Sequence, residues 1–147
     1  LRGDNVHIRY PSDNFYCINL DRRQVQMRHI EDQLQKACVR WFDLQYPKLS
    51  KYLVCVPNGG KRNAIEAAKL KQMGVRAGFP DLILLLPNSL YPFMGIELKT
   101  SKGRQSLLQK DYEVEFNNIG ARYVIVRSIE DFIDAITSHM EYINEPD

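Results

Sequence analysis

The sequence predicts an α/β fold in which a mixed central β-sheet, formed by an antiparallel hairpin and a crossover strand, is flanked by helices. Short apolar runs of strand length alternate with longer segments of helical periodicity. Two of the strand-like runs, 82–86 and 95–99, are separated by the turn sequence Pro87-Asn88-Ser89, which favours an antiparallel hairpin. A helical segment then precedes the last strand, so that strand is expected to pair in parallel with a neighbour.

The segment before the hairpin contains a helix, a strand and a second helix. Apolar residues with helical spacing begin at Ile30, and the helix that they predict ends before Pro47. The run 52–56 has the composition of a buried strand. A helix over about 62–73 follows, and Gly74 is placed to close it as the residue after the C-cap.

The segment after the hairpin contains a helix, a strand and a last helix. The first helix covers 103–119 and is closed by Gly120, the strand covers 123–126, and an amphipathic helix begins at Ile129. Three large side chains of the first helix are expected to face the core: Leu108, Tyr112 and Phe116. Near the N-terminus, residues 15–18 have the composition of a short strand.

Length and composition indicate one globular domain. The chain has 147 residues and is 44% hydrophobic, which is enough apolar material for a core. We assign 29–147 to this domain and 1–28 to an N-terminal extension whose aromatic residues make it a candidate interface arm. No apolar run reaches the roughly 18 residues of a membrane span, and no secretion signal is visible. We therefore expect no membrane association. The expected location is the cytoplasm of a bacterial or phage-infected cell or, if the protein is eukaryotic, the nucleus.

The cysteines indicate a reducing environment. Cys17, Cys38 and Cys55 are odd in number, widely spaced and without a CxxC pair, which argues against structural zinc. The three histidines are equally scattered, which argues against a histidine metal site or a Ser/His/Asp triad.

Two acids and a lysine interrupt the apolar hairpin. Asp81 and Glu97 are each eight residues from Ser89, so a hairpin centred on Ser89 places them opposite each other on one face. The two-residue period of a strand puts Lys99 on the same face as Glu97. Charge in a buried strand is costly unless it has a function. This sequence therefore predicts two carboxylates and an amine at one edge of the sheet.

Such a trio suits metal-assisted phosphodiester hydrolysis. Carboxylates bind Mg²⁺ while leaving coordination positions for water and phosphate, and the metal activates the attacking water. A lysine can position that water and offset charge in the transition state. The alternative is that Pro80-Asp81 only opens a strand and that Glu97-Leu98-Lys99 lies on a solvated strand face.

The charge distribution favours a nucleic-acid substrate. Residues 51–80 carry six basic residues against one acid, whereas 111–147 carry nine acids against two basic residues. A cationic segment around two isolated acids fits a nuclease cleft, because phosphate contacts supply most non-specific affinity. The alternative is a set of solvated helix faces. The candidate DNA-contacting residues are Asn58, Lys61, Arg62, Arg76, Lys102 and Arg104.

The glycine turn at 58–62 is not a nucleotide-binding loop. Gly60-Lys61 is followed by Arg62 rather than serine or threonine, and the first glycine of a P-loop is missing. Backbone N–H groups and cations at a helix start can still hold a DNA phosphate. We therefore expect no nucleotide cofactor and interpret the turn as a DNA-backbone contact. A simple strand-to-helix turn is the alternative.

Several short motifs occur in a characteristic order over about 31–136. They are Glu31 with Gln35 on a helix, Pro57-Asn58-Gly59-Gly60-Lys61-Arg62, the run from Gly74 to Pro80-Asp81, Ile96-Glu97-Leu98-Lys99, Gly103-Arg104-Gln105-Ser106 with Gln109, and Gly120. This order resembles the PD-(D/E)XK nuclease superfamily and, more narrowly, its virus-type replication-repair nuclease (VRR-NUC) family. The resemblance implies a restriction-endonuclease-like core.

The resemblance also implies site residues. Glu31, Asp81 and Glu97 would surround a divalent ion, Mg²⁺ or Mn²⁺, with the carbonyl of Leu98 as a further ligand. Lys99 would be the activating lysine and Gln109 a supporting glutamine, although an ordinary polar helix position is the alternative for Gln109. Helical spacing favours Glu31 over its neighbour Asp32, because Glu31 flanks the apolar stripe. A surface glutamate near a helix N-terminus is the alternative for Glu31.

The expected function is that of a Mg²⁺- or Mn²⁺-dependent DNA endonuclease of repair or recombination. Small stand-alone relatives resemble Holliday-junction resolvases, so branched, flapped or junction DNA is the expected substrate. Symmetric cutting of a junction requires a pair of active sites, which implies a homodimer. The alternatives are a restriction-like sequence-specific endonuclease and a catalytically silent DNA-binding or interaction module on the same fold.

Overall fold

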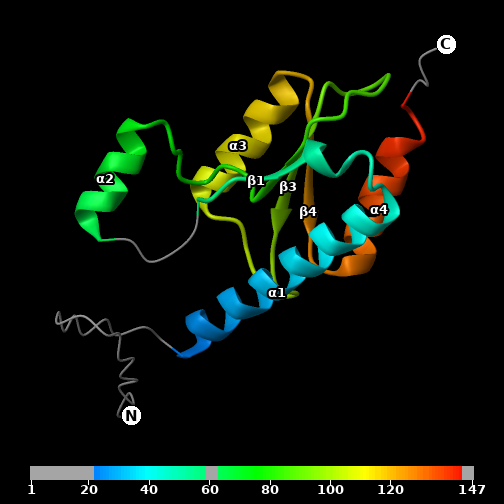
Figure 1. Ribbon diagram of the computed structural model, residues 1–147. Coiled ribbons are helices and arrows are strands. Elements are labelled where there is room, and N and C mark those ends of the chain that lie inside the picture. Colours follow the sequence, from blue (N-terminus) through cyan, green and yellow to red (C-terminus); the bar gives the residue numbers. More distant parts are fainter. Residues whose placement is uncertain (1–21, 59–62, 144–147) are drawn as a thin grey trace.

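Helices cover a mixed four-stranded sheet in the computed structural model, which describes residues 22–58 and 63–143 (Figure 1). The strands lie in the order β1-β2-β3-β4; the first two junctions are antiparallel and the third is parallel. Their bounds are β1 Leu53–Cys55, β2 Leu82–Leu84, β3 Met94–Leu98 and β4 Arg122–Val126. The predicted α/β fold with a hairpin and a crossover strand is confirmed.

The register of the β2–β3 hairpin is the one predicted from its sequence. Leu82 pairs with Ile96, so Asp81, one residue before β2, is in register with Glu97 on β3. The chain then crosses over through α3 (Leu107–Asn118), and β4 pairs in parallel with β3 as expected. The end of β3 that carries Glu97 therefore lies beside the start of β2.

Alternation along the central strands sends side chains to two separate cores. On one face, apolar residues of β2 and β3 pack against α1 (Arg22–Gln45) and α4 (Ile129–Met140), around Phe42 and Phe132. On the other face, Ile83 packs in a smaller core with Phe116 of α3. Glu97 lies on the α3 side, because it alternates with the side chains that face α1 and α4.

Helix α2 (Ala64–Gln72) is set apart from the sheet, at the left of Figure 1, and none of its residues is buried. Its ends are defined by local signals. The Asn63 side chain accepts a hydrogen bond from the backbone N of Glu66 at 2.7 Å and caps the start. Gly74 has a φ of 101° directly after the C-cap, as predicted. No helix in the described ranges is long and apolar enough to cross a membrane.

Three predicted details differ from the structure. The run 52–56 was predicted to be a buried strand, but β1 is half-buried to exposed because it lies at the edge of the sheet. Helix α1 begins at Arg22, earlier than its apolar spacing indicated, because its first turns are mostly polar. Leu108 was expected to face the core but is 52% exposed, since α3 begins only at Leu107 and Leu108 lies in its first turn. A Cβ added at Gly78 would be 2.6 Å from Leu108 Cβ, so Leu108 packs against the chain there instead. The strand predicted at 15–18 lies outside the described residues.

Gly95 allows α3 to lie close to β3, and we expect Gly95→Ala to destabilise the protein. The added Cβ would overlap the ring of Phe116 and lie 3.0 Å from Pro80 Cγ. Overpacking of this kind costs about 1–3 kcal/mol. Urea denaturation should therefore show a lower midpoint with an unchanged slope. An unchanged midpoint would mean that α3 does not pack on the sheet at Gly95.

Candidate active site

Asp81 and Glu97 face one another at the open end of the hairpin. Asp81 Oδ2 accepts a hydrogen bond from the backbone N of Leu98 at 2.8 Å, which fixes the side chain against β3. Glu97 is 0% exposed, a rare position for a carboxylate. The period-2 alternation of a strand and the hairpin register are therefore sufficient to bring the two acids together.

Only one of the two oxygens of the Glu97 carboxylate has partners among the described residues. Its Oε1 lies 2.7 Å from Lys99 Nζ and also accepts a hydrogen bond from Gln109 Nε2. Its Oε2 is buried and has no hydrogen-bond partner among the described residues. Buried polar atoms are nearly always paired, so this oxygen is available to bind a ligand such as a divalent cation.

Burial makes the negative charge of both acids costly. It raises the pKa of Asp81, an effect reduced by the Leu98 N–H and Lys99 and increased by Glu31 and Asp32. Burial, followed by the charge of Asp81, raises the pKa of Glu97 to about 7, although Lys99 acts in the opposite direction. A divalent cation between them would relieve both effects. The donor set of hard oxygens with one unpaired oxygen therefore fits Mg²⁺ or Mn²⁺.

Gln109 connects the start of α3 to Glu97. It occupies the third position of the helix, where its backbone N donates to Ser106 Oγ at 3.2 Å and its Oε1 accepts from Ser106 N at 2.8 Å. These two bonds form a capping box. The same side chain uses its Nε2 to bind Glu97, so one residue both caps α3 and orients the buried acid.

Glu31 reaches the site from α1 through the turn that follows Lys99. Its Oε1 accepts a hydrogen bond from the backbone N of Thr100 at 3.2 Å, and the Glu31 side chain is half-buried. Asp32 beside it is exposed. Among the described residues, no three His, Cys, Asp or Glu side chains are grouped to hold a metal ion together. Glu31 is therefore near Asp81 and Glu97 but does not form a three-ligand cluster with them in this structure.

Four of the residues expected to contact DNA lie in the described part of the chain. Asn58 donates from Nδ2 to the carbonyl of Phe79 at 2.8 Å, which ties the chain after β1 to the segment before Asp81. Arg76 donates to the carbonyl of Lys71 at 3.0 Å and caps the end of α2. Lys102 and Arg104 are exposed on the turn after Lys99. Lys61 and Arg62 lie outside the described residues.

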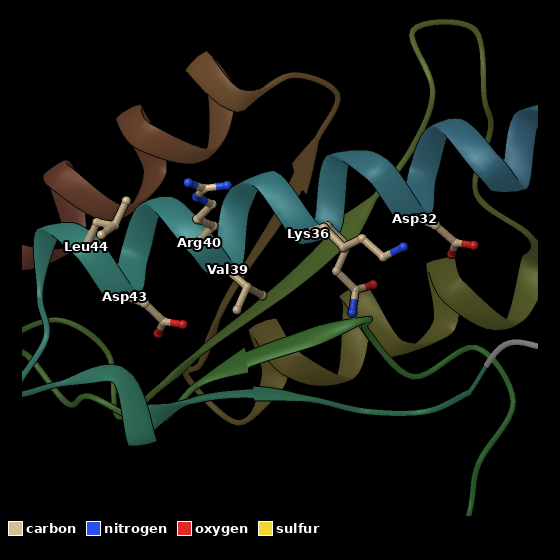
Figure 2. Close-up of a pocket in the computed structure, with 7 residues that line it drawn as sticks. Asp32, Lys36, Val39, Arg40, Asp43 and Leu44 are labelled. Carbon is tan, nitrogen blue, oxygen red and sulfur yellow. The ribbon is translucent and has the colours of Figure 1, made fainter.

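An open groove of about 470 Å³ runs along α1, and Figure 2 shows the side chains of this helix that line it. It begins near the carboxylates at Asp32 and extends to the end of the helix. Gln35 points from this face of α1 and donates to Cys55 Sγ at 3.1 Å. The lining residues are Asp32, Gln35, Lys36, Val39, Arg40, Asp43 and Leu44. The groove is thus a feature of α1 beside the carboxylate pair, not a pocket around it.

Sequence reasoning missed Thr100 and Arg127. Thr100 is 8% exposed and holds Glu31 through its backbone N–H, a role that any residue type other than proline could fill. Arg127 binds two carbonyls of the turn after Lys99. Only its position directly after a predicted strand could have drawn attention to it.

Comparison with known proteins agrees with the fold. The model of the VRR-NUC domain matches residues 20–130, which is most of the chain. A solved structure described as "VRR_NUC domain protein" is 28% identical, with a TM-score of 0.69, and the match covers 78% of this chain and 91% of that chain. No curated protein matches the chain.

Proposed function

The chain belongs to the VRR-NUC family, and we propose from this membership that it is a Mg²⁺- or Mn²⁺-dependent endonuclease that hydrolyses phosphodiester bonds of branched DNA. The fold is of the nuclease type, and the family generally uses divalent metals. The observation that carries the proposal is the pair of opposed carboxylates, half-buried Asp81 and buried Glu97, with the unpaired Glu97 Oε2. A purely structural hairpin would gain nothing from placing a half-buried and a buried carboxylate opposite each other.

Each side chain at the site has a proposed role. Asp81 and Glu97 would hold the metal, with Glu31 and the carbonyl of Leu98 as further ligands. A divalent ion at these residues would polarise the phosphate and favour ionisation of the attacking water. Lys99 Nζ, held 2.7 Å from Glu97 Oε1, would align the water and offset negative charge on the phosphate.

Glu97 is kept in place by groups that do not react. Gln109 orients Glu97 through its Nε2 hydrogen bond, and the capping box fixes Gln109 in turn. Supporting residues of this kind hold ligands in the geometry that a metal requires.

Basic residues near the carboxylates in the chain would bind the DNA backbone. Lys102 and Arg104 are exposed directly after Lys99, where a phosphate next to the scissile one would pass. Lys61, Arg62 and Arg76 would bind backbone phosphates further away, because cations contribute to affinity without regard to sequence. Asn58 would support this surface indirectly, since its side-chain amide donates a hydrogen bond to the carbonyl of Phe79.

The substrate and the assembly are proposed together. Resolution of a four-way junction needs two cuts related by two-fold symmetry, which a homodimer provides. Residues 1–28 would contribute to its interface. A silent DNA-binding module is the second candidate, but it would not need the Asp81–Glu97–Lys99 trio.

Cleavage assays test the proposal. Labelled four-way junction, flap, single-stranded and linear duplex DNA are incubated with Mg²⁺ or Mn²⁺ and wild type, Asp81→Ala, Lys99→Ala or the exposed control Lys110→Ala. Paired symmetric nicks in the junction should occur with wild type and Lys110→Ala and be lost in the other two variants. DNA binding without cleavage in any metal would favour the silent module. A monomer in sedimentation at assay concentration would contradict the homodimer.

A further inference from the structure

One arginine joins the end of β4 to the turn behind the carboxylates. Arg127 Nη1 donates to the carbonyl oxygens of Thr100 and Gly103, each at 2.7 Å. Its backbone N donates to Asp131 Oδ2 at 2.9 Å, so the arginine itself is anchored to the first turn of α4. Bonds from a charged donor are the stronger class of hydrogen bond, so this contact holds the turn firmly.

The turn that Arg127 binds is tight. The backbone N of Gly103 donates to the carbonyl of Thr100 at 3.1 Å. A Cβ added at Gly103 would lie 3.0 Å from Thr100 Oγ1 and 3.4 Å from Lys99 Cδ. The Thr100 carbonyl therefore accepts from both Gly103 and Arg127, and the turn packs directly on the stem of the candidate activating lysine.

Three parts of the candidate site meet at this turn. Thr100 N holds Glu31 from α1 at 3.2 Å, and Lys99 N is bound to the carbonyl of Val126 on β4 at 3.0 Å. Beyond Gly103 the chain enters the capping box, whose glutamine binds Glu97. A shift of the turn would therefore move the Glu31 support, the Lys99 stem and the start of α3 together.

From these contacts we propose that Arg127 is a positioning residue of the metal site. By clamping the Thr100–Gly103 turn it keeps the Thr100 N–H on Glu31 and keeps Lys99 beside Glu97. This inference rests on the proposed metal-dependent nuclease function. In the described ranges the Arg127 guanidinium forms no ion pair with a carboxylate, so its bonds to the turn are not a by-product of a salt bridge.

A direct DNA contact is the competing role for Arg127. The side chains of Lys102, in the same turn, and Arg104, directly after it, are exposed. Neither forms a hydrogen bond or ion pair with a described residue, as expected of cations that bind phosphate. Arg127 instead uses one nitrogen for two carbonyls of its own chain. The two roles differ in what they predict: a positioning residue affects metal affinity, whereas a phosphate contact affects DNA affinity and its salt dependence.

Arg122 provides a matched control on the same strand. It lies at the other end of β4, where Nη1 donates to the carbonyl of Ala135 at 3.1 Å and Nη2 donates to Ser138 Oγ at 3.0 Å. Like Arg127 it ties β4 to other parts of the chain, but it is remote from the carboxylates. Loss of Arg122 should therefore reproduce the structural cost without the effect on the site.

The test compares Arg127→Gln, Arg127→Lys and Arg122→Gln with wild type. Mn²⁺ binding is measured by calorimetry without DNA, and cleavage is measured as a function of Mn²⁺ and of DNA concentration. We expect Arg127→Gln to weaken Mn²⁺ binding by roughly tenfold, as for other residues that support metal ligands. The Mn²⁺ concentration for half-maximal cleavage should rise by the same factor, while KM for DNA at saturating Mn²⁺ stays unchanged.

The other variants separate positioning from general stability. Arg127→Lys should recover part of the Mn²⁺ affinity, because an ammonium can donate to two carbonyls but lacks the reach and rigidity of a guanidinium. Arg122→Gln should lower the thermal midpoint and leave Mn²⁺ affinity unchanged.

Several results would overturn the inference. If Arg127→Gln binds Mn²⁺ with wild-type affinity, the inference is wrong. A raised KM for DNA with a weaker salt dependence of DNA affinity would then identify Arg127 as a phosphate contact. An equal loss of Mn²⁺ affinity in Arg122→Gln would show general destabilisation instead. If wild type neither binds Mn²⁺ nor cleaves DNA, the proposed function fails and the inference with it. If wild type does both and Arg127→Gln is unaffected, only the inference fails.

Discussion

Asp81→Asn should abolish cleavage and at the same time stabilise the metal-free protein at neutral pH. The amide oxygen of asparagine can still accept the hydrogen bond from Leu98 N, so the local structure is kept. The negative charge needed to hold a metal is lost, and metal assistance contributes several kcal/mol, so cleavage should fall roughly a hundredfold or more. The stabilisation follows because a half-buried charge that repels Glu97 has been removed.

The gain in stability should depend on pH in a defined direction. The pKa of Asp81 is raised above its ordinary 3.8 in the folded protein, so the protonated acid is favoured by folding. That contribution is complete below the ordinary pKa and is lost as pH rises through the folded pKa. Thermal unfolding in EDTA should therefore show the largest advantage of Asp81→Asn near neutral pH and almost none below about pH 4.

The comparison with metal and with a second variant tests the cause. Excess Mg²⁺ should raise the midpoint of wild type but not that of Asp81→Asn, because only a protein that binds the ion is stabilised by it. Asp111→Asn on the exposed side of α3 should change neither activity nor the response to Mg²⁺. A lower midpoint of Asp81→Asn in EDTA at neutral pH would contradict the electrostatic account of the site.

Gln109→Glu should separate the two roles of Gln109. Glutamate at the third helix position can still accept from Ser106 N, so the capping box and α3 should remain. The donor to Glu97 is replaced by a carboxylate oxygen, which would repel Glu97 and displace it. We expect cleavage to fall about tenfold to a hundredfold, the usual effect of losing a group that orients a metal ligand. Far-UV circular dichroism should be unchanged.

Ser106→Ala provides the reciprocal variant. It removes the side chain that accepts from Gln109 N and should cost about 1 kcal/mol of stability, while Gln109 Nε2 can still reach Glu97. Denaturant unfolding and cleavage should be measured on both variants. Gln109→Glu should lose activity and keep its stability, whereas Ser106→Ala should lose stability and keep its activity. Full activity in Gln109→Glu would show that its bond to Glu97 has no part in the reaction.

Much of the fold follows from local sequence signals. Gly74 and Gly120 have positive φ values at the two helix ends where they were expected, because a left-handed residue after a C-cap is a local requirement. The hairpin register could be predicted because a slip of one residue would move every apolar side chain of β2 and β3 to the opposite face. The opposition of Asp81 and Glu97 follows from that register and from nothing more distant.

Contacts between distant segments could not be predicted in the same way. The exposure of Leu108 depends on where α3 begins and on how its first turn packs against Gly78, and the apolar spacing of the helix does not contain that information. The hydrogen bond from Thr100 N to Glu31 joins residues 69 positions apart through a backbone group that every non-proline residue carries. Composition and periodicity therefore give no signal for such a contact.

The sequence by itself therefore determined the order of the elements, the hairpin register and the opposed pair of acids, because each depends on periodicity, turn residues or capping within one or two neighbouring elements. Only the tertiary structure decided how α1, α3 and β4 converge on that pair through Glu31, Gln109 and Arg127. The physical reason is that the positions of helices on a sheet are set by packing over the whole core, and backbone groups then become partners of side chains that are remote in the chain.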